Sequence, residues 1–164
     1  MDARAFELLI ELEGGLSDRK TDPGGRTNLG VTQYTLSRLR RDHLSLPKRV
    51  DDLTREHVEL IYRVQYWQPF EPLPRPIAIV AFGAAVNCGV GRASRWVQQA
   101  VGASVDGVIG PKTVKNAQAF VLDAVDDVTA RLLTHYMSLH KHNLEYGLGW
   151  ARRAVAFHNL ALRS

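Results

Sequence analysis

The sequence predicts a mainly helical fold with one small irregular β-hairpin after the first helix. Apolar residues recur at helical spacing along most of the 164 residues. The clearest exception is the segment 14–31, which is dense in Gly, Asp and Asn and therefore favours turns. No strand-like run is long enough for a sheet-based enzyme, and the sequence has no Gly-x-Ser-x-Gly elbow, phosphate-binding loop or Rossmann fingerprint.

The first predicted helix spans residues 2–13 and ends at Gly14 and Gly15. Glu13 continues its apolar stripe, whereas Glu7 and Glu11 fall on another face. The stripe consists of Phe6, Leu9 and Ile10. Both an apolar environment and the negative end of a helix dipole disfavour an ionised carboxylate. We therefore expect the pKa of Glu13 to be raised, as a general acid requires; the alternative is a glutamate that reaches into water.

The turn signals that follow predict an irregular hairpin that presents Asp22 and Thr27. Thr32 is a predicted N-cap for a helix over about 33–43, and Thr54 for a helix over about 55–67. The polar segment 14–31 therefore lies between two predicted helices. Such a segment is a poor core element and a good candidate for a catalytic loop.

An aromatic cluster at 66–70 precedes a proline-rich turn, which is the only plausible internal boundary. Aromatic residues here favour core packing, with sugar stacking by Trp67 as the alternative. We expect one compact domain over 1–164, in which 1–71 carries the catalytic loop and 72–164 forms a helical half that does not separate from it.

The second half is predicted to consist of helices throughout. The segment 76–87 is apolar nearly all round, so it should be the central buried helix, with the amide of Asn87 at its end. Pro111 should begin a short helix after the Asp106-Gly107 turn. Gly147 and Gly149 are expected to interrupt the helical structure before the last helix. The remaining helices are predicted over about 92–101, 121–143 and 150–162.

The composition of the chain excludes some classes of protein. No run approaches the roughly 18 apolar residues of a membrane span, and the N-terminal segment lacks the apolar centre of a signal peptide. We therefore expect synthesis in the cytoplasm without an export signal. The single cysteine, Cys88, excludes an internal disulfide.

The formal charge is uneven along the chain. Residues 1–71 hold 11 Lys/Arg and 12 Asp/Glu, and residues 72–164 hold 10 and 5. A basic second half suggests an anionic partner or an ordinary solvated surface. The basic residues are dispersed, which disfavours nucleic-acid binding. The spacing of His135, His140 and His142 does not favour a metal site, and no cofactor is expected.

Two groups of motifs carry a resemblance to a known family. The first group resembles the motif of glycoside hydrolase family 108, the phage-type N-acetylmuramidases, which would imply a lysozyme-like helical fold. The second resembles the predicted peptidoglycan-binding region that accompanies it. The first comprises Glu13-Gly14-Gly15, Asp22-Pro23-Gly24-Gly25, Thr27-Asn28 and Gly30-Val31-Thr32; the second comprises Ala85-Val86-Asn87, Gly91-Arg92-Ala93, Asp106-Gly107, Gly110-Pro111 and Thr113.

The resemblance implies a peptidoglycan hydrolase that cleaves the MurNAc–GlcNAc β-1,4 bond. Glu13 would be the acid, Asp22 the base or electrostatic partner with Asp18 as its rival, and Thr27 would orient the attacking water. Thr27 lies one residue closer to Asp22 than in the Glu…Asp…Thr arrangement of phage lysozymes. We also expect substrate contacts from a set of four further residues. These are Asn28, Tyr34, Trp67 and Asn87.

The same resemblance implies an endolysin that waits in the host cytoplasm and reaches the wall after release by a holin. The basic C-terminal half could add contacts to anionic wall polymer or outer-membrane lipopolysaccharide, particularly residues 150–164. Two alternatives remain open. One is a lytic transglycosylase that uses Glu13 alone, and the other is a non-catalytic peptidoglycan-binding or virion protein.

Overall fold

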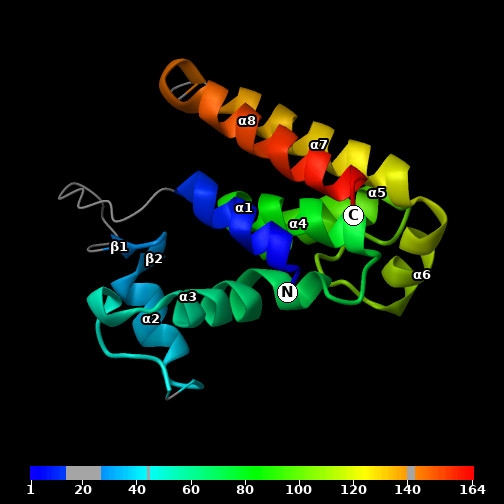
Figure 1. The fold of residues 1–164 in the computed structure, drawn as a ribbon. Helices are drawn as coiled ribbons and strands as arrows, with labels where there is room; N and C mark the ends of the chain where they lie inside the picture. The colour runs from blue at the N-terminus through cyan, green and yellow to red at the C-terminus, as the bar shows by residue number, and fades with distance from the viewer. Residues whose placement is uncertain (14–26, 44, 140–142) are drawn as a thin grey trace. The chain divides into compact units, whose positions relative to one another are not determined.

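The computed structural model describes residues 1–13, 27–43, 45–139 and 143–164. Within these ranges the chain forms helices α1 to α8 and one two-stranded antiparallel sheet, which confirms the predicted mainly helical fold (Figure 1). The chain divides into two compact units: unit 1 holds Met1–Ala5 and Tyr66–Ser164, and unit 2 holds Phe6–Gln65. The expectation of a single inseparable body over 1–164 stays a prediction.

Helix α1 (Ala3–Glu13) begins in unit 1 and continues into unit 2. Asp2 starts the helix, because its Oδ1 accepts a hydrogen bond of 3.1 Å from the main-chain N–H of Ala5. Of the predicted stripe, Phe6 and Leu9 are buried and Ile10 is half-buried, whereas the side chain of Glu13 lies outside the described part of the chain. Glu11 is exposed and Glu7 forms an ion pair with Arg55, so both lie on the solvated face, as expected.

A tight hairpin follows in unit 2. Strand β1 (Thr27–Asn28) pairs with β2 (Val31–Thr32), with Thr27 opposite Thr32. The two connecting residues both have positive φ, 47° at Leu29 and 77° at Gly30. Such a pair matches the type I′ turn, whose twist suits a two-residue hairpin loop. Within 27–32, the predicted hairpin is confirmed; Asp22 lies outside the described residues.

The helices of unit 2 begin at the predicted caps. Thr32 accepts a hydrogen bond from the N–H of Thr35 and starts α2 (Gln33–Leu39). After a 3-10 turn, η1 (Val50–Asp52), Thr54 and His57 form a reciprocal capping box that starts α3 (Arg55–Tyr62). The helix predicted over 55–67 is α-helical only as far as Tyr62. A π-helical turn, η2 (Arg63–Trp67), follows it, and then a 3-10 turn, η3 (Gln68–Phe70).

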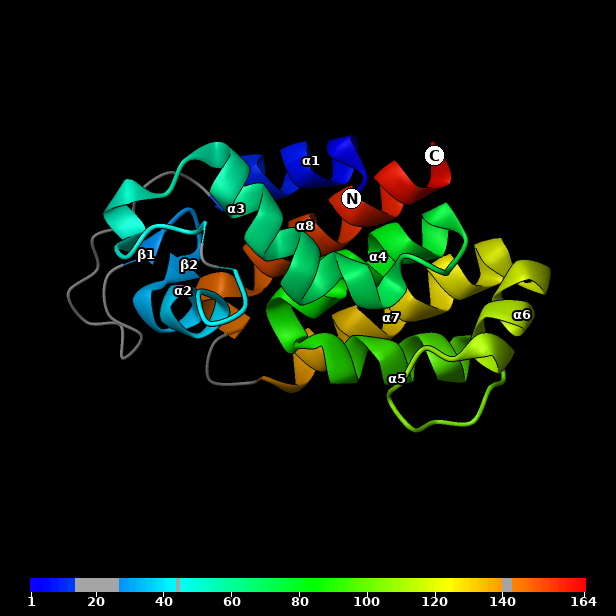
Figure 2. The same ribbon diagram turned by 90° about the horizontal axis from the view of Figure 1, so that it is seen from below.

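Helix α4 (Arg75–Cys88) is the centre of unit 1, as predicted from its apolar sequence. Every residue from Ile77 to Ala85 is buried. Helices α5, α7 and α8 all pack against α4 (Figures 1 and 2). The remaining helices of the unit are α5 (Val90–Ala100), α6 (Pro111–Ala119), α7 (Val121–Ser138) and α8 (Asn143–Leu162).

Two predicted boundaries in unit 1 are wrong. The long helix expected over 121–143 ends at Ser138, and α8 begins at Asn143 and passes through Gly147 and Gly149 without a break. A glycine costs about 1 kcal/mol in a helix, which tertiary packing can outweigh. Helix α8 buries one face over its C-terminal half, through Ala154, Phe157 and Ala161, and next to the glycines the ring of Trp150 packs on that of Tyr136 in α7 at 5.3 Å between centroids. Across the described residues, no helix combines the length and apolar character needed to span a membrane.

Candidate active site

The proposed acid, Glu13, is the last residue of α1. Its backbone therefore lies at the helix C-terminus, as the sequence predicts. Its side chain, together with Asp18 and Asp22, lies outside the part of the chain that the structure describes. The assignment of the acid and of its carboxylate partner stays a prediction.

Thr27 begins β1 and is half-buried. Its strand is held in place from two sides. The Nδ2 of Asn28 donates a 2.9 Å hydrogen bond to the main-chain oxygen of Val50, and the hydroxyl of Tyr62 donates a 3.2 Å bond to the oxygen of Leu29. These two bonds anchor the hairpin that carries Thr27, and the catalytic role of Thr27 stays a prediction.

The two predicted substrate contacts in unit 2 differ in exposure. Asn28 is 8% exposed and its amide bonds Val50, so the structure gives it a role in holding the hairpin. Tyr34, in the first turn of α2, is 74% exposed and presents its ring to solvent. An exposed tyrosine ring is suited to stacking on a sugar. Substrate binding by either residue stays a prediction.

The two predicted substrate contacts in unit 1 are both engaged within the unit. Trp67 is 6% exposed, and its ring meets Phe82 edge-on at 5.6 Å between centroids. Asn87 donates a 2.6 Å hydrogen bond from Nδ2 to the hydroxyl of Tyr136, which joins α4 to α7. Burial raises the pKa of Tyr136 to about 12, against the opposing effect of the Asn87 bond. The structure thus shows a packing role for Trp67 and an interhelical hydrogen bond for Asn87, which is exposed rather than buried; substrate binding by either residue stays a prediction.

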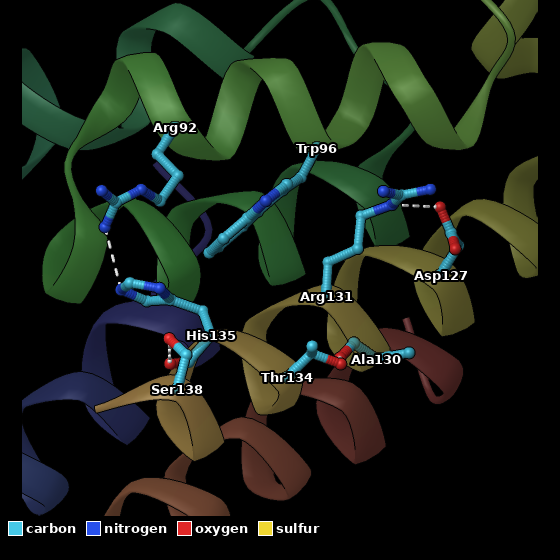
Figure 3. A pocket seen from close by; sticks show the side chains of 8 residues that line it. All are labelled: Arg92, Trp96, Asp127, Ala130, Arg131, Thr134, His135 and Ser138. Carbon is cyan, nitrogen blue, oxygen red and sulfur yellow. Dashed lines mark hydrogen bonds and ion pairs between the residues drawn. The ribbon is translucent and has the colours of Figure 1, made fainter. Parts of the chain in front are cut away.

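The sequence did not single out a groove between α5 and α7 in unit 1. It has a volume of about 560 Å³ and receives Arg92 and Trp96 from α5 (Figure 3). Helix α7 supplies the other lining residues, which are Asp127, Ala130, Arg131, Thr134, His135 and Ser138. Helical spacing along α7 could have placed most of them on one face, but pairing them with α5 required the fold.

The helices and the small hairpin after the first helix agree with the lysozyme-like helical fold that the resemblance implies. Residues 6–89 match the model of the family described as Glycosyl hydrolase 108, which is just over half of the 164 residues. The chain belongs to glycosyl hydrolase family 108. It is therefore a glycoside hydrolase, and the family supports peptidoglycan as its substrate.

A solved structure supports the same conclusion. The structure of Brucella abortus SagA is similar to this chain over 98% of the chain and 93% of its own, with a TM-score of 0.83 and 30% sequence identity. No curated protein matches the sequence. The likeness to SagA covers both units, whereas the family match covers all of unit 2 and reaches the end of α4 in unit 1.

Proposed function

We propose that the protein is an N-acetylmuramidase, which hydrolyses the MurNAc–GlcNAc β-1,4 bond of peptidoglycan. The observation that carries the proposal is the position of Glu13. It ends a helix whose stripe of Phe6 and Leu9 is buried, and the rigid β1–β2 hairpin with Thr27 follows in the same unit. Family membership supplies the glycosidase class.

The proposed chemistry needs two groups on opposite sides of the scissile bond. Glu13 protonates the leaving oxygen, because a helix C-terminus and an apolar face favour a neutral carboxyl group. Asp22 acts as the base or electrostatic partner of the oxocarbenium-like transition state, and Thr27 orients the attacking water. Asp18 is the rival for the second role. An Asp22→Asn variant that keeps most of the activity would transfer the role to Asp18.

Mass spectrometry of wall fragments tests the reaction directly. A muramidase adds water and leaves reducing MurNAc ends. A lytic transglycosylase leaves anhydro-MurNAc ends, which are lighter by one water, and a glucosaminidase leaves reducing GlcNAc ends. Either of the latter products would replace the proposal. Binding to sacculi without release of any fragment would instead support a non-catalytic wall-binding or virion protein.

We further propose that the enzyme acts as an endolysin, held in the host cytoplasm and released to the wall by a holin. The exposed side of α8 supports an additional contact with an anionic outer surface such as lipopolysaccharide. Leu148, Val155 and Leu162 are exposed at seven-residue intervals, and Arg152 is exposed between the first two. Binding of the full chain to lipopolysaccharide vesicles should fall when Val155 and Leu162 are changed to serine; unchanged binding would remove this contact.

A further inference from the structure

We propose that Tyr62 is a positioning residue for the reaction, which acts through the turn between strands β1 and β2. Its hydroxyl donates a 3.2 Å hydrogen bond to the main-chain oxygen of Leu29, 33 residues earlier in the chain. The tyrosine is the last residue of α3 and is 3% exposed. Both residues belong to unit 2, which also contains Thr27. The inference rests on the proposed function, because that function gives Thr27 its role in orienting the attacking water.

The oxygen that Tyr62 binds belongs to a residue in an unfavourable backbone conformation. Among the described residues, Leu29 is the only one other than glycine with a positive φ, at 47°. A residue with a Cβ atom is crowded in this conformation, because the Cβ lies close to the following carbonyl oxygen. Two-residue hairpin turns of this type therefore favour Asn, Asp or Gly at the first position. A strained conformation persists only where surrounding contacts hold it, and the Tyr62 bond is a contact of that kind.

The turn controls the position of Thr27 through the pairing of the two strands. Thr27 pairs with Thr32, one residue pair away from the turn. The type I′ geometry matches the twist of the strands, whereas a type I or II turn would spread them apart. The bond from Tyr62 fixes the plane of the peptide group that follows Leu29, and with it the geometry of the turn. Without this bond, we expect the turn to relax and Thr27 to move.

Helix α3 also contacts α1, the helix that ends at Glu13. At the first residue of α3, Arg55 forms an ion pair with Glu7, and its guanidinium carbon lies 5.4 Å from the centre of the Phe6 ring. One helix therefore contacts both the helix that carries the proposed acid and the β1–β2 turn. Because the Arg55 pair is exposed and such pairs contribute little, we assign the positioning role to Tyr62.

The test compares wall digestion by Tyr62→Phe, which removes only the hydroxyl, with digestion by the wild type. The measurement is total fragment release from purified peptidoglycan, counted whatever the chemistry of the new ends. A small misplacement of a group can reduce a rate by about 100-fold, so we expect kcat to fall by about 10- to 100-fold and KM to change by less than about twofold. Tyr136→Phe is the matched control, since it also removes a buried, hydrogen-bonded hydroxyl, but in unit 1. It should lower the melting temperature without lowering kcat.

Two double variants test the route through the turn. In a Thr27→Ala protein, Tyr62→Phe should have no further effect on kcat, because Tyr62 acts through Thr27. Leu29→Asn should restore most of the activity that Tyr62→Phe loses, because asparagine adopts a positive φ more readily than leucine. The rescue is measured against Leu29→Asn alone, which reports any separate cost of losing the leucine side chain.

Four results would overturn the inference. The first is a folded Tyr62→Phe protein with the kcat of the wild type. The second is an equal loss of kcat in Tyr62→Phe and Tyr136→Phe, which would reduce the effect to stability. The third is a Tyr62→Phe effect of undiminished size in the Thr27→Ala protein, and the fourth is a failure of Leu29→Asn to raise the activity of Tyr62→Phe.

These results are distinguishable from a failure of the proposed function. A wild type that releases reducing MurNAc ends supports the proposed function whatever the kcat of Tyr62→Phe. Anhydro-MurNAc or reducing GlcNAc ends from the wild type would contradict the proposed function, and the comparison of kcat values would still decide whether Tyr62 positions Thr27.

Discussion

The side chain of Asn28 donates a 2.9 Å hydrogen bond to the main-chain oxygen of Val50, 22 residues further along the chain. The bond is buried, and it joins strand β1 to the η1 turn. Gln33 reinforces the same junction, since its side chain bonds the oxygen of Lys48 and the N–H of Val50 at 2.8 and 3.1 Å. The hairpin that presents Thr27 thus depends on a short segment that precedes α3.

Replacing Asn28 with alanine should destabilise the protein by about 1–3 kcal/mol, because the oxygen of Val50 would stay buried without this donor. For a chain of this size, the melting temperature falls by about 2–4 °C for each kcal/mol. Asn159→Ala, at an exposed position of α8, is the control and should leave the melting temperature unchanged or slightly raised. An unchanged melting temperature in Asn28→Ala, combined with a higher KM, would instead favour the substrate contact predicted from the sequence.

Two glycines of unit 1 should respond oppositely to alanine. A Cβ on Gly83 would lie 2.6 Å from Cγ of Phe157, so α4 and α8 would have to separate. Overpacking of this kind costs about 1–3 kcal/mol. A Cβ on Gly149 would meet no atom within 4 Å, and alanine should stabilise that helical position by about 0.5–1 kcal/mol. A Gly83→Ala protein that melts at or above the wild-type temperature would contradict the close packing of α4 against Phe157 of α8, and a Gly149→Ala protein that melts lower would contradict the open space at that position.

Substitutions at the two ends of the Asn87–Tyr136 hydrogen bond should have coupled effects on the free energy of unfolding. Asn87→Ala and Tyr136→Phe each remove the link between α4 and α7, and each should cost about 0.5–1.5 kcal/mol. The double variant should lose less than the sum of the two, because both changes break the same bond. Urea melts of the four proteins measure this coupling. Additive losses of stability would contradict this coupling. If KM also rose in Asn87→Ala alone, the result would favour the predicted contact between Asn87 and the substrate.

The protein should lose stability in mild acid because of the environment of His135. Partial burial, assisted by the charge of Arg92, lowers the pKa of His135 below its ordinary value of about 6.5. The folded state thus disfavours the protonated form. The stabilisation from neutral His135 is complete above about pH 6.5 and is lost as the pH falls through the lower folded-state pKa. Melting temperatures measured across this range should fall less in His135→Gln than in the wild type; equal profiles would contradict the effect.

The sequence predicted those structural elements that depend on interactions between residues close together in the chain. The hydroxyls of Thr32 and Thr54 cap helices where their positions in the sequence indicated, and the apolar run of α4 is buried as its composition required. Interactions between helices decided the rest. Gly147 and Gly149 remain helical in a helix that packs on α7 through Trp150 and on the core of unit 1 through Ala154, Phe157 and Ala161. Arg92 meets His135 43 residues away, a contact for which no local pattern exists.

A pair of isosteric variants on helix α1 tests the proposed catalytic role of Glu13 most directly. Glu13→Gln removes the proposed acid, whereas Glu11→Gln makes the same change at an exposed position two residues earlier. The measurement is the initial rate of reducing-end release from purified peptidoglycan, with folding verified by thermal melts. General acid catalysis contributes about 10²–10⁴-fold, so the rate of Glu13→Gln should fall by at least a factor of about 100 and Glu11→Gln should match the wild type. A folded Glu13→Gln protein that releases reducing ends at the wild-type rate would contradict the assignment.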